Sequence, residues 1–479
     1  MAGALLLILF SSPARAAVIG PELDVVLRST GARGAIPVIV TLQKKVDPMA
    51  FTDTDKRVRR AKLLLALKQE SDQSFQPTRR LAEERGGTHI RQLWAAHAMT
   101  LTAGPDLVRT LAALPDVASI RMDAAVRVFA VKRGGVGTRS VEATLGHTPS
   151  SGIDADRFNR VAHPTAVSYS STTPEWNLTA VKGPDLWAIG FKGQGVVVAG
   201  LDTGVDGEHP DLAAQYRGGT NSWYDPYGEH ATPTDKDGHG THAMSLAVGR
   251  AGGGTAIGMA PDAQWIAAKM FNDAGVSRES VLHQSLQWVL DPDGDSETDD
   301  APDVVNLSWA VVRQNVCSRV FQDELDVLRA SGIAVVMSAG NSGPGASTSI
   351  SPANNPGQLS VGSVDRHSNV STFSSRGPSA CDGGLFPVLV APGETVLTAD
   401  LSFGGLPLYA TVAGTSFAAP HVTGAMALLM SAVPTATLPV LESALKASAV
   451  SVGANGASSQ AGPGLIDTLA AYRAVLAGV

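Results

Sequence analysis

Cysteine, aromatic residues and long apolar runs are all scarce in this chain of 479 residues. Two cysteines are too few for a disulfide-rich scaffold or for a zinc site built from four cysteines. Aromatic residues make up only 5% of the chain, whereas 50 residues are glycine, a balance typical of tight turns and closely packed helices. No apolar run approaches the ~18 residues needed to cross a bilayer, so we expect a soluble protein that does not enter a membrane.

A net positive charge is also lacking. The 37 lysine and arginine residues against 44 acidic residues give −7, so a nucleic-acid partner is not expected. The length predicts two or three domains, and 44% hydrophobic residues exclude a disordered chain. Residues 18–168 carry 22 basic against 15 acidic residues, and residues 169–479 carry 14 against 29. This contrast favours docking of one part on the other, although drift in composition between domains is the alternative.

The first 17 residues have the pattern of a secretory signal peptide. An apolar run at 2–10 is followed by Ala14-Arg15-Ala16, which fits a small-x-small cleavage site. A frayed N-terminal helix is the alternative interpretation. We therefore expect a secreted protein, located outside the cell or in the periplasm.

Residues 30–130 are expected to form a small α+β domain in the order β-α-β-α-β. After it, residues 131–175 are rich in Gly, Ser, Thr, Pro and His without periodicity, as in an exposed linker where a protease would cut. The periodicities predict strands at 36–42, 90–101 and 118–129 and helices at 57–85 and 105–114.

From residue 193 onward, short apolar runs alternate with helical patterns. Such alternation predicts an α/β fold, with a mostly parallel sheet flanked by helices on both faces. Active sites in such folds lie at the carboxyl ends of the strands. The expected strands are 196–201, 265–269, 304–307, 334–338, 359–361 and 388–390, and the expected helices are 239–249, 277–290, 320–330, 416–433 and 438–446.

Four segments carry residues suited to nucleophilic catalysis. An apolar strand ends at Asp202, the segment Asp-Gly-His-Gly-Thr-His places His239 at a helix start, and Gly-Thr-Ser-Phe-Ala-Ala-Pro places Ser416 at another. Asn341 follows a further strand in Ala-Gly-Asn-Ser-Gly. A serine hydroxyl is a poor nucleophile at neutral pH and needs an adjacent base, which a histidine oriented by an aspartate supplies.

Together these segments resemble the subtilase (subtilisin-like serine protease) family, in which acid, histidine and serine occur in this chain order. The resemblance covers roughly 176–479 and is strongest to the bacillopeptidase F-like subgroup, through 175–177, 301–305 and Ser308-Trp309. It implies a subtilisin-like fold in a catalytic domain at 176–479. It also implies an Asp202–His239–Ser416 triad and an oxyanion hole formed by the Asn341 side chain and the Ser416 backbone N–H.

The resemblance gives the N-terminal domain a role as well. Subtilases are generally made with an inhibitory propeptide that assists folding and is cut off autocatalytically, and residues 30–130 resemble one. The expected partners are therefore polypeptide substrates and the chain's own propeptide, and we expect a monomer that requires no cofactor. The alternatives are a permanent accessory domain at 30–130 and, for the whole chain, an inactive subtilase fold that only binds peptides.

Each motif also has another interpretation. Asp-Thr-Gly at 202–204 occurs in aspartic proteases, but that chemistry needs two such aspartates and only one is present. His239 and His242 are spaced as in zinc proteases, but Gly240 stands where those enzymes have glutamate. His242 and His421 are better explained as packed core histidines, and Asn341 taken alone would be a turn residue. An esterase activity of the same residues would be a side activity.

The walls of a substrate pocket follow from the resemblance. Ser308, Trp309 and Ala310 stand where the family has Ser-Leu-Gly, and Ala339 and Gly340 form the opposite wall. Extended peptides pair with such an edge strand, so side chains in place of glycine should reshape the pocket. Neither wall segment contains an acidic residue, so a preference for basic side chains is not suggested.

Two segments of the chain are candidates for calcium binding, and its two cysteines are candidates for a disulfide. Asp211 matches a family calcium ligand and is the weak calcium candidate, because the partner loop 249–255 offers few side-chain oxygens and carries an arginine. The acidic segment 291–300 is either a solvated insertion or a calcium loop, and it lacks the EF-hand pattern. Cys317 and Cys381 are candidates for a disulfide, which is plausible in a secreted protein.

Overall fold

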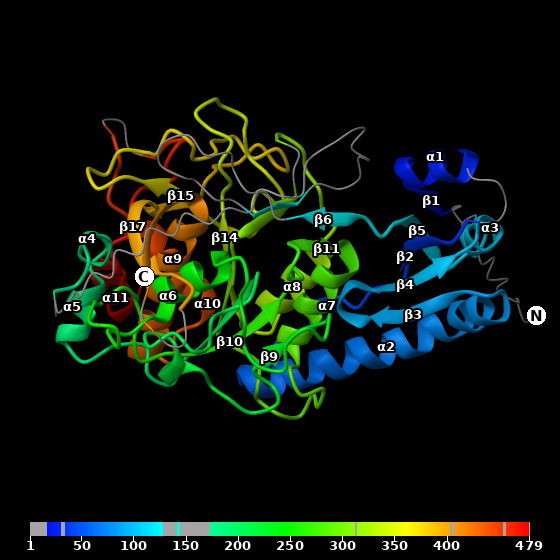
Figure 1. The fold of residues 1–479 in the computed structure, drawn as a ribbon, viewed down its shortest axis with the longest axis horizontal. Coiled ribbons are helices and arrows are strands. Elements are labelled where there is room, and N and C mark those ends of the chain that lie inside the picture. The colour runs from blue at the N-terminus through cyan, green and yellow to red at the C-terminus, as the bar shows by residue number, and fades with distance from the viewer. Residues whose placement is uncertain are drawn as a thin grey trace, which may run out of the picture. The chain divides into compact units, whose positions relative to one another are not determined.

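In the computed structural model, the described residues are 17–29, 34–127, 141–143, 173–311, 314–402, 406, 408–453 and 457–478. The expected signal peptide up to residue 16 and most of the expected linker lie outside them. The chain falls into two compact units (Figure 1): Met1–Val46 with Leu67–Asp123, and Asp47–Ala66 with Ala124–Val479. Among the described helices, none is both long enough and apolar enough to span a membrane.

The first unit is built on a five-stranded sheet in the order β1-β5-β2-β4-β3, in which β2 runs antiparallel to both neighbours. Its core includes Val38 and Val40 from β2 together with Leu101 and Ile120. The expected small α+β fold is therefore confirmed. The elements are β1 (Val18–Ile19), α1 (Pro21–Ser29), β2 (Ile36–Leu42), β3 (Thr88–Leu93), the 3-10 helix Trp94–Ala96, β4 (Ala98–Ala103), α3 (Pro105–Ala112) and β5 (Val117–Met122), and helix α2 (Lys56–Glu84) belongs partly to each unit.

One expected strand of the first unit is in fact two strands. The prediction of a single strand at 90–101 is wrong, because β3 ends at Leu93 and β4 begins at Ala98. Between them the chain makes a 3-10 turn, and His97 has a left-handed backbone with φ 48°. The turn reverses the chain, so the two strands pair antiparallel, with Arg91 opposite Thr100.

The second unit contains a seven-stranded sheet in the order β16-β15-β14-β12-β8-β10-β9, and every pair in it is parallel. The inner strands are almost entirely buried, as expected for continuous apolar runs covered on both faces. The sheet strands are β8 (Val197–Asp202), β9 (Trp223–Tyr224), β10 (Gln264–Lys269), β12 (Val304–Leu307), β14 (Ala334–Ser338), β15 (Leu359–Val364) and β16 (Leu389–Pro392).

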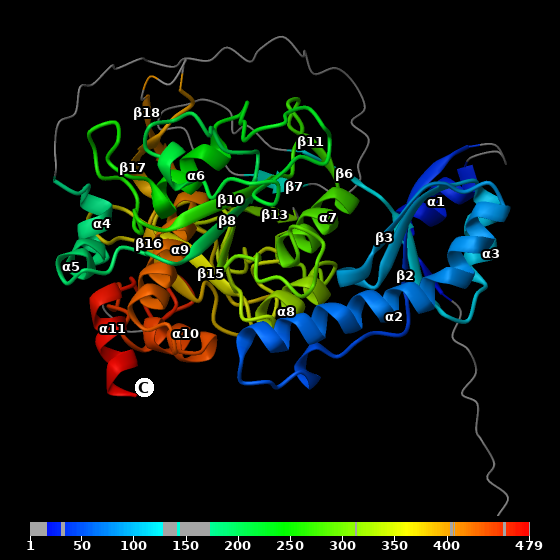
Figure 2. The ribbon, with the colours of Figure 1, turned by 90° about the horizontal axis from the view of Figure 1, so that it is seen from below.

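Helices cover both faces of this sheet, which confirms the expected α/β architecture. Figure 2 shows α9 on one side and α7 with α8 on the other. Helix α9 packs along β12, β14, β15 and β16 and against α6, whereas α7 packs on β8 and β10, and α8 on β14. The helices are α4 (Trp176–Ala180), α5 (Gly183–Ala188), α6 (His239–Val248), α7 (Glu279–Leu290), α8 (Gln322–Ala330), α9 (Thr415–Ala432), α10 (Leu438–Ala447) and α11 (Thr468–Ala477), with 3-10 helices at Pro48–Ala50 and Ala213–Gln215.

Short two-stranded pairings complete the second unit. β17 (Glu394–Ala399) and β18 (Tyr409–Ala413) form an antiparallel ribbon. β6 (Ala125–Arg127) runs antiparallel to β11 (Val276–Arg278), and β7 (Val141–Ala143) runs parallel to β13 (Trp309–Val311). Segments from before residue 150 therefore add strands to two edges that belong to the expected catalytic domain.

Candidate active site

Asp202 is the last residue of β8, a central strand of the parallel sheet. Parallel strands bring their carboxyl ends to one edge of the sheet, so the buried apolar run of β8 delivers this carboxylate to that edge. Asp202 is 3% exposed. Its Oδ1 accepts the backbone N–H of Thr203 at 2.7 Å and lies 2.8 Å from Nδ1 of His239. Since a carboxylate only accepts, Nδ1 carries the proton.

His239 is the first residue of α6 and is 1% exposed. The preceding residue, Gly238, has a left-handed backbone with φ 101°, which sets the direction in which the helix begins. Gly240 must also be small, because a Cβ there would lie 2.1 Å from the carbonyl oxygen of Gly204. The Gly-His-Gly sequence therefore lets the start of the helix approach the end of β8.

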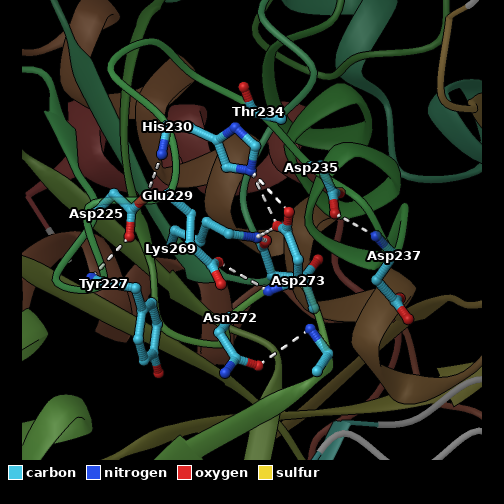
Figure 3. A network of polar contacts seen from close by, with 12 residues as sticks. Asp225, Tyr227, Glu229, His230, Thr234, Asp235, Asp237, Lys269, Asn272 and Asp273 are labelled. Atoms are coloured by element: carbon cyan, nitrogen blue, oxygen red, sulfur yellow. Dashed lines mark hydrogen bonds and ion pairs between the residues drawn. The ribbon is translucent and has the colours of Figure 1, made fainter.

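Asp235 anchors the turn that leads into His239. Its Oδ1 accepts the backbone N–H groups of Asp237 at 2.9 Å and Gly238 at 3.0 Å. Its Oδ2 accepts the N–H of Thr241 at 3.0 Å and the hydroxyl of Thr241 at 2.8 Å, and Figure 3 shows the Asp235–Asp237 contact. Burial would raise the pKa of Asp235, but these hydrogen bonds hold it below its ordinary value. The sequence analysis missed Asp235, whose signal is an acid four residues before the histidine.

Two opposing effects set the pKa of His239. Burial disfavours the charged imidazolium and lowers the pKa, whereas the charge of Asp202 and its hydrogen bond raise it. The second effect is larger, and the pKa of His239 ends above its ordinary value. Asp202 therefore fixes the tautomer of the ring and stabilises the imidazolium that forms when Nε2 accepts a proton.

Ser416 is the second residue of α9 and is 2% exposed. Its Oγ lies 3.4 Å from the carbonyl oxygen of Ser308, a long hydrogen bond. The ring of Phe417, the next residue, packs against His239 with centroids 5.4 Å apart, so the serine turn lies next to the imidazole. Nε2 of His239 is buried and has no hydrogen-bond partner among the described residues. The nitrogen that would accept the serine proton is free.

The side chain of Asn341 is held by one end only. Its Oδ1 accepts the backbone N–H of Thr415 at 2.8 Å and the Thr415 hydroxyl at 2.9 Å. That hydroxyl in turn accepts the N–H of Gly340 at 3.0 Å. Nδ2 of Asn341 is buried without a partner in the described part of the chain. Thr415, which the sequence analysis missed although it precedes the serine, fixes the amide so that its two N–H donors stay available.

The expected pocket walls lie beside these residues. Ser308 donates its hydroxyl to the carbonyl oxygen of Ser416 at 2.8 Å, which ties one wall to the serine turn. Trp309 and Ala310 are buried in β13, and Trp309 packs edge-on against Phe321 at 5.2 Å between centroids. On the opposite wall, Ala339 is buried and follows β14 directly.

Gly340 completes that wall with a left-handed backbone at φ 97°. This conformation favours glycine, and a Cβ on Gly340 would also lie 2.2 Å from the Ile350 side chain. The structure thus groups the expected triad residues, Asn341 and the expected pocket walls at one edge of the sheet.

A polar network joins Lys269, Asp273 and His230 (Figure 3). Lys269 is 1% exposed, donates to the carbonyl oxygen of Thr203 at 3.0 Å and lies 3.1 Å from Asp273. His230 Nε2 lies 3.0 Å from both oxygens of Asp273, whose backbone N–H donates to Glu229 at 2.9 Å. Glu229, His230 and Asp273 bring ligand atoms within 4.8 Å of one another, but hydrogen-bond donors already engage both carboxylates.

The calcium candidate Asp211 is buried and fully hydrogen bonded. Its Oδ1 accepts the N–H of Gly253 at 2.6 Å, and its Oδ2 accepts the hydroxyl of Tyr409 at 2.7 Å. Burial raises the pKa of Asp211, and the hydrogen bonds from Gly253 and Tyr409 oppose that rise. These surroundings do not fit Ca²⁺, because the ion takes oxygen ligands whereas Asp211 faces an N–H and an O–H donor.

The acidic segment that follows α7 gathers three carboxylates. Asp291, Asp293 and Asp300 bring ligand atoms within 4.8 Å of one another. Burial raises the pKa of Asp300, and the charges of Asp293 and Asp291 raise it further. The carboxylate of Asp300 also accepts the amide of Asn221 at 3.0 Å.

The remaining candidates are held by structural contacts. His242 Nε2 lies 3.0 Å from Asp400, and His421 lies between Asn177 and the carbonyl oxygen of Phe417. Burial lowers the pKa of His421 to about 4, so its ring is neutral at pH 7. Cys317 and Cys381 are joined by a disulfide that connects the loop after β13 to a segment 64 residues further along the chain.

Comparison with known proteins gives a consistent result. Residues 193–464 match the Subtilase family. The chain is 35% identical to bacillopeptidase F of Bacillus subtilis (strain 168) over 327 residues, which is 64% of this chain but only 22% of that protein. It is 31% identical to subtilisin E of the same strain over 320 residues, covering 65% of this chain and 74% of that protein. It is also 31% identical to subtilisin DY of Bacillus licheniformis, covering 62% of this chain and 98% of that protein.

Proposed function

This chain belongs to the subtilase family of serine endopeptidases, and from that premise we propose that it hydrolyses peptide bonds with Asp202, His239 and Ser416, assisted by Asn341. We further propose that it is secreted as a zymogen that processes itself. The observation that carries the catalytic proposal is a set of unmet hydrogen-bonding atoms. Buried polar atoms are nearly always paired, yet His239 Nε2 and Asn341 Nδ2 have no hydrogen-bond partner among the described residues, although His239 Nδ1 and Asn341 Oδ1 are both hydrogen bonded.

Acylation uses these atoms as follows. Ser416 Oγ bonds to the substrate carbonyl carbon while its proton passes to His239 Nε2, and the carbonyl electron pair moves onto the oxygen. When that intermediate collapses, the C–N bond breaks and the proton on His239 passes to the leaving amine. Water then repeats the sequence, giving a proton to His239 as its oxygen attacks the acyl carbon. The carboxylic acid leaves, and Ser416 recovers its proton.

The oxyanion of each intermediate has two donors. Asn341 Nδ2 is one, because Thr415 engages the opposite end of that amide. The backbone N–H of Ser416 is the other, at the start of the 18-residue helix α9, where unpaired N–H groups and the helix dipole favour negative charge. Both donors are fixed before substrate arrives, so stabilising the oxyanion requires little reorganisation.

The zymogen proposal draws support from the strand pairings. A peptide substrate binds an exposed strand edge by adding a strand. Residues 141–143 run parallel to β13, the strand that carries two of the expected pocket residues, and residues 125–127 pair with β11. A part of the chain that precedes the expected catalytic domain thus pairs with the edge that carries expected pocket residues. Secretion is supported by the signal-like N-terminus and by the Cys317–Cys381 disulfide.

Intact mass tests these proposals together. The chain expressed from Val18 should lose its N-terminal part at a cut within 131–175, whereas Ser416→Ala should keep its full mass. A cut in both chains would assign processing to another protease. A folded wild-type chain that stays whole and leaves casein intact would contradict the protease proposal and favour the inactive peptide-binding fold.

A further inference from the structure

A basic cluster at the start of α2 contacts an acidic surface of the second unit, remote in sequence from the triad residues. Asp47–Ala66 belong to this unit, and Lys56-Arg-Val-Arg-Arg60 begins the helix. Lys56 Nζ lies 2.7 Å from Asp303 Oδ1, and Arg57 Nε lies 2.6 Å from Asp299 Oδ2. Arg60 Nη1 lies 3.1 Å from Asp299 Oδ1. Three cations therefore meet two carboxylates.

The same cluster binds the end of a helix. Arg59 Nε donates to the carbonyl oxygen of Ala330 at 3.0 Å, and Arg60 Nε donates to that of Ser331 at 3.3 Å. Ala330 is the last residue of α8, whose final carbonyls carry the negative end of the helix dipole. Gly332, with φ 77°, leaves the space, because a Cβ there would lie 3.2 Å from Arg59 Nη2.

The burial of Arg60 separates this contact from ordinary surface ion pairs. Its side chain is 3% exposed, whereas that of Arg57 is 76% exposed. Burial of a guanidinium is costly, and it lowers the pKa of Arg60 against the opposing effect of Asp299 and Asp303. An exposed pair is weakened by salt, whereas a buried, partnered arginine is screened much less.

We propose that Lys56–Arg60 is an ionic anchor that holds the N-terminal segment on Asp299, Asp303 and the end of α8 independently of the substrate edges. The proposal rests on the zymogen proposal for its role. After the cut, the anchor keeps the N-terminal fragment bound to the enzyme. A high salt concentration weakens the exposed ion pairs of the anchor and loss of Asp299 removes the partner of the buried Arg60, so the two changes together release the fragment. The acidic residues thus provide a binding surface for one segment of the same chain.

The first test uses the intact chain with Ser416→Ala, so that no cut complicates the result. Hydrogen exchange of peptides covering 56–66 should become about tenfold faster when Asp299→Asn is added. Glu297→Gln removes a charge from the same loop and should leave this exchange unchanged, because in the described part of the chain no hydrogen bond or ion pair joins the Glu297 side chain to Lys56–Arg60. Equal exchange in all three chains would overturn the proposal.

A second variant keeps the test decisive. Arg60→Leu keeps bulk and removes the charge, and it should speed the exchange of 56–66 by a similar factor. The double variant with Asp299→Asn should add little, because both changes break one contact. If Asp299→Asn also speeds hydrogen exchange in β8 and β12, the variant disturbs more than the anchor. The exchange of 56–66 in Arg60→Leu then decides whether the anchor exists. Fully additive effects of the two changes would overturn the anchor.

The active chain tests the role of the anchor. After processing, gel filtration at low salt should recover the N-terminal fragment with the enzyme, and Asp299→Asn should release more of it than Glu297→Gln. Equal retention in the two variants would overturn the proposed role. No cut at all would contradict the zymogen proposal, and the hydrogen-exchange result would still decide whether the anchor exists.

Discussion

Asp235 and Asn341 both lie beside residues of the expected triad, but the structure leaves their polar atoms in different states. Each carboxylate oxygen of Asp235 accepts two hydrogen bonds. Asn341 is bonded through its oxygen only, and its nitrogen has no partner among the described residues. His239 shows the same asymmetry within one ring, because Nδ1 is hydrogen bonded whereas Nε2 has no partner in the part of the chain that the structure describes. In Asn341 and His239 the bonded atom fixes the side chain, and the atom without a partner is the one that we propose acts on the substrate.

Changing Asp202, the partner of the hydrogen-bonded nitrogen of His239, should have the largest effect on activity. Asp202→Asn keeps the shape but removes the charge that raises the pKa of His239 and favours the wrong tautomer. We expect kcat to fall by about 10⁴-fold, a magnitude known from serine proteases with this triad rather than derived from this chain. Since catalysis needs neutral His239, the acid limb of kcat/KM should also move to lower pH. Rates measured across pH check both effects, and an unshifted limb would contradict the assigned cause.

Removing the amide of Asn341, whose Nδ2 has no partner among the described residues, should have the next largest effect on activity. Asn341→Ala should lower kcat by about 10²–10³-fold with little change in KM, a magnitude established for the equivalent donor of a subtilisin. Thr415→Val leaves the donor in place but removes a hydroxyl that orients it, so we expect a smaller loss in the same parameter. Single-turnover rates of the two variants test this order. A larger loss from Thr415→Val would contradict the positioning role.

Removing the charge of Asp235 should affect stability. In the intact Ser416→Ala chain, Asp235→Asn places an NH₂ group among N–H and O–H donors, and we expect a loss of about 2–4 kcal/mol in the free energy of unfolding. Since the folded-state pKa of Asp235 is lowered, its stabilisation is full above the unfolded pKa of about 4 and is lost as pH falls through the folded value. The difference between the two chains should therefore shrink in acid.

Asp365→Asn is the matched control for that experiment. Asp365 also accepts backbone N–H groups, from His367 and Asn369, but it is not buried. We expect a loss below about 1 kcal/mol, because water can replace these hydrogen bonds. Urea unfolding at pH 7 and pH 4 compares the chains. Equal losses at the two aspartates would show that burial does not set the cost.

Much of the site could be predicted because its chemistry lies in short motifs. Asp202, His239, Ser416 and Asn341 each lie at or near one end of a regular element, and the sequence patterns placed those elements correctly to within one residue. The hydrogen bonds that hold these residues in place could not be predicted, because they join positions far apart in the sequence. Thr415 and Asn341 are 74 residues apart, and Lys269 and Thr203 are 66 residues apart. In the first unit, a turn at His97 split an apparently single strand.

The Tyr409 hydroxyl that donates a hydrogen bond to Asp211 is covalently part of the protein. Its local concentration around the carboxylate is fixed by the fold and does not change on dilution. A carboxylate bound to an ion from solution would instead be governed by mass action, and the stability of that contact would fall as the free ion became scarce. The hydrogen bond from Tyr409 to Asp211 therefore does not depend on the concentration of a free ligand.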